Sequence, residues 1–166
     1  MMQNVVLDTN VIVSAVLSPT GNPAKIVNMG LDKSIQLNIS TGILAEYEEV
    51  LSRTEFDFSV EKRDTLLAGV KKNSVLVEPS VSSIAMPDED DRVFYDTAKE
   101  SGAILVTGNT KHFPAESFIM TPIMERRRIM QVQIPMCTYH YGLFLSIRKV
   151  MFVTMSSLLS VNSISL

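Results

Sequence analysis

Residues 4–13 read NVVLDTNVIV, and this stretch decides the fold that the sequence predicts. The apolar run Val5–Leu7 fits a short buried β-strand, and the polar triplet that begins at Asp8 fits the turn and helix cap after it. In open α/β sheets, ligands and catalytic groups gather at this carboxyl end of the strands. Taken alone, Asp8 is best explained as an ordinary helix N-cap, so its role depends on which other residues reach the same sheet edge.

The rest of the chain alternates predicted helices with predicted strands. Strands are predicted over residues 35–39, 75–77, 103–106 and 118–120, and helices over residues 11–16, 22–32, 41–53, 60–73 and 88–101. Such alternation is typical of a parallel sheet with helices on both faces. The sequence therefore predicts an α/β fold in which a central, mainly parallel sheet lies between two layers of helices.

The composition indicates one globular domain in a reducing compartment. The chain has 166 residues, of which 46% are hydrophobic, enough to bury a core. Its only cysteine, Cys137, excludes an internal disulfide. The N-terminus lacks a signal-peptide pattern, and the apolar tract Leu143–Leu159 is interrupted by Arg148 and Lys149 and is too short to span a membrane. We therefore expect a cytoplasmic protein without a membrane segment.

Further acidic residues border the apolar faces of two predicted helices. On the helix over residues 41–53, Glu46 and Glu48 flank the apolar face on opposite sides, and geometry alone does not choose between them. On the last predicted helix, Asp91 borders the apolar face and closes a run of four acids that begins at Asp88. The first turn of a helix favours acids, but four in succession repel one another unless a positive charge lies nearby.

The predicted strand over residues 103–106 runs into a second polar turn. Thr107 and Asn109 in this turn can lie beside Asp8 because the carboxyl ends of parallel strands meet at one edge of the sheet. Three carboxylates at that edge, without a cluster of His or Cys residues, form an all-oxygen site that suits Mg²⁺ or Mn²⁺ rather than zinc. The natural chemistry of such a site is attack of water on a phosphodiester bond.

Four segments of the chain carry a family resemblance: VVLDTNV, LAEYEEVL, DEDDRVFYDTA and AILVTGNTKHFP. Together they resemble the PIN-domain family, over residues 2–122. Within it, the sequence is most similar to the bacterial toxins of toxin–antitoxin pairs that are related to the VapC ribonucleases. The resemblance implies a compact α/β/α domain and a metal-dependent endoribonuclease that cuts RNA and uses Mg²⁺ or Mn²⁺. It also implies a cognate antitoxin protein as partner and a homodimer.

The resemblance assigns roles to individual residues. The family's acidic positions fall on Asp8, Glu46 and Asp91, which settles the choice against Glu48. Asp8 and Asp91 would hold the metal ion, and Glu46 would complete its coordination or orient the attacking water. The fourth position, often an aspartate, is Asn109 here, which removes one charge from the site.

Neighbouring residues are expected to assist these four. Asn10 and Thr107 would support them by hydrogen bonds. Arg92 and Lys111 flank the site in sequence and could contact phosphates, although exposed solubilising charges explain both residues better. His112 is expected to pack or hydrogen-bond within its turn rather than to bind metal.

Two other interpretations remain open at this point. The asparagine at the fourth position and the unusual C-terminal segment also fit a catalytically inactive PIN-like module that binds RNA or protein. A phosphatase of the haloacid dehalogenase type would use Asp8 as its nucleophile. That class needs a second aspartate two residues later, where this chain has Asn10.

Composition and charge change near Pro122. Residues 1–122 carry 10 basic and 17 acidic side chains, a net charge of −7, whereas residues 123–166 carry 5 basic and 1 acidic side chain, a net charge of +4. We predict one domain over residues 1–122 and a C-terminal segment of uncertain order, unlike the family, over residues 123–166. Two hypotheses account for this segment: a coding sequence shifted out of frame, or a genuine addition whose run Arg126–Arg128 contacts RNA phosphates.

Overall fold

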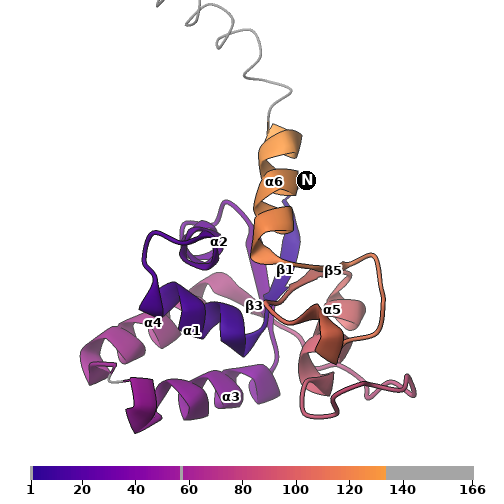
Figure 1. Cartoon of the computed structure of the whole chain (residues 1–166), viewed down its shortest axis with the longest axis horizontal. Coiled ribbons are helices and arrows are strands. Elements are labelled where there is room, and N and C mark those ends of the chain that lie inside the picture. Colours follow the sequence, from indigo (N-terminus) through magenta and orange to yellow (C-terminus); the bar gives the residue numbers. More distant parts are fainter. Residues whose placement is uncertain (1, 57, 134–166) are drawn as a thin grey trace, which may run out of the picture. The chain divides into compact units, whose positions relative to one another are not determined.

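The structure, a computed structural model, describes residues 2–56 and 58–133. The described residues up to Arg127 belong to one compact unit built on five parallel strands in the order β3-β2-β1-β4-β5 (Figure 1). The strands are β1 (Asn4–Leu7), β2 (Gln36–Ile39), β3 (Ser74–Leu76), β4 (Ile104–Val106) and β5 (Ile119–Met120). This sheet confirms the α/β fold that the alternating pattern predicts.

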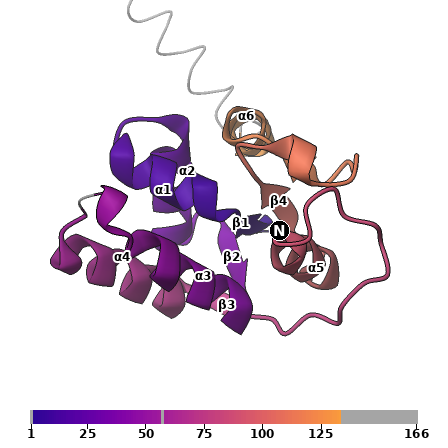
Figure 2. The same ribbon diagram turned by 60° about the horizontal axis from the view of Figure 1, so that its bottom comes forward.

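Helices cover both faces of the sheet. The described α-helices are α1 (Thr9–Leu17), α2 (Asn22–Leu31), α3 (Thr41–Leu51), α4 (Val60–Asn73), α5 (Arg92–Ser101) and α6 (Pro122–Gln133), with short 3-10 turns η1 (Thr54–Phe56) and η2 (Thr110–His112). Figure 2 shows α1 to α4 on one side of the strands and α5 on the other. The predicted α/β/α layering is therefore confirmed.

The central strand β1 carries the residues that open the site. Val5 and Val6 are completely buried because β1 pairs with β2 on one side and with β4 on the other. Leu7 pairs with Val106 in the register of β1 and β4, and the backbone N–H of Asp8 donates to the Val106 carbonyl at 2.9 Å. The polar turns after these two strands are consequently neighbours, as the sequence predicts for a parallel sheet.

The start of α5 differs from the prediction. The helix expected from Asp88 begins at Arg92, because the acids before it form a turn. Asp88 Oδ1 accepts a hydrogen bond from the Asp90 backbone at 3.2 Å, and the Arg92 N–H donates to the Glu89 carbonyl at 3.1 Å. Such side-chain bonds to the local backbone compete with helix formation. Gly102 ends α5 in the left-handed conformation at φ +60°, at the predicted position.

Hydrogen bonds hold the connection between β3 and α5 to the first residues of two helices, α3 and α5. Near its beginning, Glu78 accepts hydrogen bonds from the Thr41 backbone and hydroxyl, both at 3.1 Å, at the start of α3. Further along, the Arg92 guanidinium donates to the carbonyls of Ser82 at 2.8 Å and Ile84 at 2.9 Å. The segment therefore ties the amino end of α3 to the amino end of α5, although it has no regular structure.

Only the first part of the predicted C-terminal segment can be compared with the structure. Residues 134–166 lie outside the described residues, so the domain boundary after Pro122 and both hypotheses for residues 123–166 stay predictions. Arg126, the first member of the arginine run, donates to the side-chain oxygen of Asn22 at 3.1 Å. In the part of the chain that the structure describes, no helix has the length and apolar character needed to cross a membrane.

Candidate metal centre

Asp8 joins β1 to α1 at the carboxyl edge of the sheet. Its side chain caps α1 by accepting a hydrogen bond from the Asn10 backbone, 3.1 Å from Oδ1. The Asn10 amide and the Thr107 hydroxyl donate to Oδ2 at 2.7 and 2.6 Å. With 4% of its surface exposed, Asp8 is held in one orientation by three donors. The carboxylate therefore caps a helix and faces the sheet edge at the same time.

Asn10 bridges the turns that follow β1 and β4. Its side-chain oxygen accepts a hydrogen bond from the Gly108 backbone at 2.8 Å, and its amide nitrogen donates to the Thr107 hydroxyl at 3.3 Å. The same hydroxyl accepts from the Asn109 backbone at 2.9 Å. A β-carbon on Gly108 would lie 3.0 Å from the Asn10 oxygen, so only glycine allows this close approach without a shift. The structure thus brings Asn10 and Thr107 together around Asp8.

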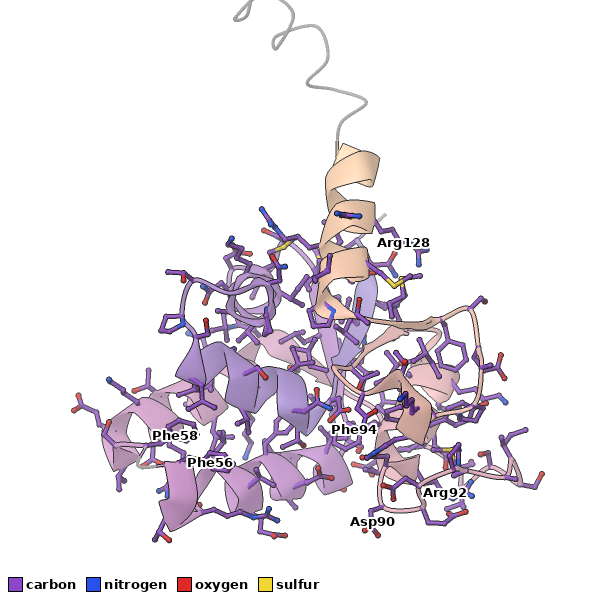
Figure 3. All side chains as sticks on the ribbon, viewed as in Figure 1. Phe56, Phe58, Asp90, Arg92, Phe94 and Arg128 are labelled. Carbon is purple, nitrogen blue, oxygen red and sulfur yellow. The ribbon has the colours of Figure 1, made fainter. Side chains whose placement is uncertain are left out.

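Glu46 reaches the same edge from α3. The Thr9 hydroxyl donates to Glu46 Oε1 at 2.6 Å. The next residue on α3, Tyr47, is fully buried and donates its hydroxyl hydrogen to the Leu7 carbonyl at the end of β1. Tyr47 also stacks on Phe94 of α5, with ring centroids 6.4 Å apart, and Figure 3 labels Phe94 between these helices. These contacts fix α3 against the strand that carries Asp8.

A second group of acidic side chains lies at the start of α5. Asp91 is the N-cap residue of α5, and Asp88 precedes it by one turn. His112, in η2 after β4, places Nδ1 2.8 Å from Asp91 Oδ2 and 3.2 Å from Asp88 Oδ2. One ligand-type atom from each of the three lies within 4.8 Å of the others. His112 forms the kind of hydrogen bond that the sequence predicts, but with acids outside its own turn.

The carboxylates act on one another electrostatically. Burial raises the pKa of Asp8, and repulsion from Asp91 adds to this, against the hydrogen bonds that Asp8 accepts. Burial also raises the pKa of Glu46, with further repulsion from Asp8 and Asp91. The pKa of Asp91 is raised by burial and by the charge of Asp88. The carboxylates at the start of α1, on α3 and at the start of α5 therefore interact as one negatively charged group.

The remaining predicted residues lie around this site in different ways. Asn109 follows β4 and is half-buried, and Lys111 is exposed on η2. Arg92 directs its guanidinium at Glu89 and at backbone carbonyls of the connection before α5, so its donors are occupied within the protein. Glu48, the alternative that helix geometry leaves open, lines a separate pocket of about 360 Å³ with Ser52, Arg63, Asp64 and Leu67.

Comparison with known proteins identifies the family. A family model described as the PIN domain matches residues 4–111, more than half of the chain. The chain belongs to the PIN-domain family. A curated relative, the uncharacterized protein MJ1680 of Methanocaldococcus jannaschii, is 33% identical over 108 residues, which cover 63% of this chain and 70% of the relative.

Two solved structures are similar in fold to this PIN domain. A chain of VapBC2 from Rickettsia felis, bound to a DNA fragment from its promoter, is 20% identical and has a TM-score of 0.48. That match covers 71% of this chain and 97% of the other. A chain of VapBC-1 from nontypeable Haemophilus influenzae is 17% identical with a TM-score of 0.44, and the match covers 66% of this chain and 90% of the other. At these identities the likeness is one of fold alone.

The carboxylates of this PIN domain fit a divalent cation. Among the described residues, neither Asp8 nor Glu46 forms a salt bridge with a Lys or Arg side chain, and Asp91 pairs only with His112. Uncompensated burial of mutually repelling carboxylates is costly, and a divalent ion would offset it. Carboxylate oxygens are the ligands that Mg²⁺ and Mn²⁺ prefer, so the donor set fits either ion.

Sequence reasoning misses three residues that shape this site: Thr9, Tyr47 and Asp88. The signal for Thr9 is its place inside the polar triplet that ends β1. Tyr47 is predicted only as part of an apolar helix face, yet a buried tyrosine hydroxyl needs a hydrogen-bond partner, which is a usable signal. Asp88 is predicted as the first residue of a helix, whereas the run of four acids points to a positive charge nearby.

Proposed function

We propose that this PIN domain is a metal-dependent endoribonuclease that hydrolyses RNA phosphodiester bonds. One observation carries the proposal: Asp8, Glu46 and Asp91 come from three different elements and repel one another at the same sheet edge. A structural role would favour pairing each acid with a base, as in ordinary ion pairs. Clusters of acids with raised pKa are instead typical of functional sites.

The proposed metal ligands are Asp8 and Asp91, with Mg²⁺ or Mn²⁺ as the ion. When bound, such an ion lowers the pKa of a water molecule and neutralises charge on the leaving oxygen. Asp8 is already oriented by Asn10 and Thr107, so it can bind without a rearrangement. Asp91 is 18% exposed, which leaves it reachable by solvent and substrate.

Glu46 is proposed to orient the attacking water and accept its proton. Burial and the neighbouring acids raise its pKa, which brings a carboxylate closer to the range of a useful general base. The hydrogen bond from Thr9 holds one oxygen of Glu46 and leaves the other for water. Asn109 would supply an amide beside the site without adding charge. Lys111, exposed on η2, is the proposed phosphate contact.

A matched pair of substitutions tests this proposal. RNA cleavage is measured with Mn²⁺ for the wild type, Asp8→Asn, Glu46→Gln and Glu48→Gln. Glu48 is the control because it lies on the same helix as Glu46 but lines another pocket. We expect Asp8→Asn and Glu46→Gln to lower the rate by about 100-fold or more, while Glu48→Gln stays near the wild-type rate. Equal activity in all four proteins would end the nuclease proposal. A wild type that binds RNA or protein without cleaving RNA would favour an inactive PIN-like module.

We propose further that the enzyme is the toxin of a toxin–antitoxin pair, acts in the cytoplasm and forms a homodimer. The motif resemblance supports these points. An apolar pocket of about 130 Å³ offers a surface that an antitoxin could cover, and it is lined mainly by side chains of α1, α2 and α4: Ala15, Val16, Pro19, Ala24, Val27, Asn28, Leu31 and Leu66. Co-expression with a neighbouring short reading frame should restore growth and give a copurifying complex, and sedimentation measures the dimer.

A further inference from the structure

Three ligand-type atoms converge beside the proposed nuclease residues. Asp88 and Asp91 belong to the turn before α5, and His112 comes from η2 after the neighbouring strand. The His112 Nδ1 lies between the two carboxylates, 2.8 Å from one Oδ2 and 3.2 Å from the other. Within the described residues, this is the group of His, Cys, Asp and Glu side chains whose ligand atoms come closest to a metal-binding arrangement.

The spacing of these atoms suits an octahedral ion. With bonds of about 2.1 Å, adjacent ligand atoms around such an ion lie about 3 Å apart. The two separations from His112 Nδ1, 2.8 and 3.2 Å, are close to this edge and are also hydrogen-bond distances, so an ion would replace those contacts. Ligand atoms of the three residues lie within 4.8 Å of one another. Binding of the ion would release any proton held between Nδ1 and the two carboxylates, since metal binding releases ligand protons.

Local structure already orients the two acids. Asp88 Oδ1 accepts from the Asp90 backbone at 3.2 Å, which turns Oδ2 toward His112. Arg92 holds the same turn by a bidentate ion pair with Glu89, at 2.7 and 2.8 Å. Figure 3 labels Asp90 and Arg92 at this turn. The ligands are therefore preorganised, which is what a binding site needs.

Solvent can reach the three side chains. Asp88 is 38% exposed, Asp91 18% and His112 43%. An ion could enter without opening the fold, and water molecules could fill the coordination positions that the protein leaves free. The negative charges of Asp8 and Glu46 interact with Asp91 and add to the attraction for a cation.

We propose that Asp88, Asp91 and His112 form a second cation position, which prefers a divalent transition-metal ion over Mg²⁺. Mg²⁺ is a hard ion that binds oxygen ligands and keeps much of its water, whereas imidazole suits transition metals. The first position, around Asp8, offers only oxygen. The second shares Asp91 with it but needs neither Asp8 nor RNA cleavage, so the proposal goes beyond the nuclease function.

Electron paramagnetic resonance of Mn²⁺ bound to the full chain tests the proposal. An imidazole ligand gives a nitrogen modulation in the Mn²⁺ echo signal. We expect this modulation in the wild type and its loss in His112→Gln. The matched control is His140→Gln, the same chemical change at the only other histidine, which should keep the signal. Titration should show Mn²⁺ affinity at this position falling about tenfold or more in His112→Gln, with a smaller change for Mg²⁺.

Two further variants make the result decisive. Asp88→Asn should weaken Mn²⁺ binding at this position even if His112→Gln folds poorly, and Asp8→Asn should keep the nitrogen modulation. Bound Mn²⁺ without nitrogen modulation in the wild type would overturn the proposal, and so would a modulation lost only in His140→Gln. Inactivity of the wild type toward RNA, with the modulation present, would count against the nuclease proposal alone.

Discussion

Asp8 and Asp88 are both acids beside Asp91, but the protein holds them in opposite ways. Asp8 is buried and accepts hydrogen bonds from three donors, whereas Asp88 is 38% exposed on a turn and faces His112. Asp8 caps a helix that packs on the core, and its burial raises its pKa. One corner of the site is therefore part of the folded core, and the other is an accessible surface turn.

The difference separates stability from ligand binding. A carboxylate that caps a helix contributes to folding as well as to function, so its loss affects both. A carboxylate on an exposed turn contributes little to folding, so its loss should affect mainly the binding of the ion. Substitutions at the two corners should consequently give different combinations of effects on stability and on metal affinity.

The largest expected contrast is between Asp8→Ala and Asp88→Ala. Asp8→Ala removes the cap of α1 and leaves the Thr107 hydroxyl without its acceptor, so we expect a loss of about 1–2 kcal/mol in unfolding free energy. Asp88→Ala should stay within about 0.5 kcal/mol of the wild type. Urea unfolding in metal-free buffer measures both. Equal losses would mean that the two corners do not differ as described.

Tyr47→Phe tests how the core corner positions Glu46. The change keeps the ring stacked on Phe94 but leaves the Leu7 carbonyl without its hydroxyl donor, at a cost of about 1 kcal/mol. Because Tyr47 follows Glu46 on α3, we expect RNA cleavage to fall about tenfold in kcat with little change in KM. A change in KM alone would place Tyr47 outside the positioning of Glu46. The control is Tyr95→Phe, the same change at a buried tyrosine on a different helix, α5.

The sequence predicts the core corner better than the surface corner, for a physical reason. The run Val5–Leu7 followed by Asp8 is a local pattern, so strand, turn and cap follow from adjacent residues. The edge shared with Thr107 follows from the parallel sheet alone. Much of the fold is predictable in this way because strands and helices have distinct periods.

Contacts between distant segments are not encoded in local patterns. Helical periodicity places Glu46 and Glu48 symmetrically about the apolar face, and only contacts from Thr9 and Tyr47 to other elements orient α3. The bond between His112 and Asp91 joins residues 21 positions apart and depends on how η2 packs against the start of α5. The local pattern predicts helix at Asp88, where the structure has a turn, because capping and turn formation use the same side-chain chemistry.

Arg92→Gln tests what holds the surface corner. The guanidinium donates to Glu89 and to carbonyls of the connection before α5, so its loss should loosen this turn and weaken Mn²⁺ binding at the second position about threefold. The salt dependence of RNA binding should not change. Lys111→Gln should instead reduce the slope of log affinity against log salt by about 0.7, one phosphate contact on a single strand. A reduced slope for Arg92→Gln would instead show that the Arg92 side chain contacts an RNA phosphate.

The smallest expected effect is on the pH dependence of stability, which joins both corners through their mutual repulsion. The pKa values of Asp8, Glu46 and Asp91 are raised above 3.8, 4.5 and 3.8, so the folded state binds more protons than the unfolded state just above these values. Stability in EDTA should therefore fall as pH rises through that window, and Mn²⁺ should restore it near neutral pH.

Comparing the melting temperatures of Glu46→Gln and Glu48→Gln isolates the contribution of the Glu46 carboxylate to this pH dependence. In EDTA, Glu46→Gln should melt above the wild type at pH 8 and approach it near pH 4, because the substitution removes a charge that burial opposes. A shift of Glu46→Gln that does not depend on pH, or an equal shift in Glu48→Gln, would show that the repulsion between the two corners is not what limits stability.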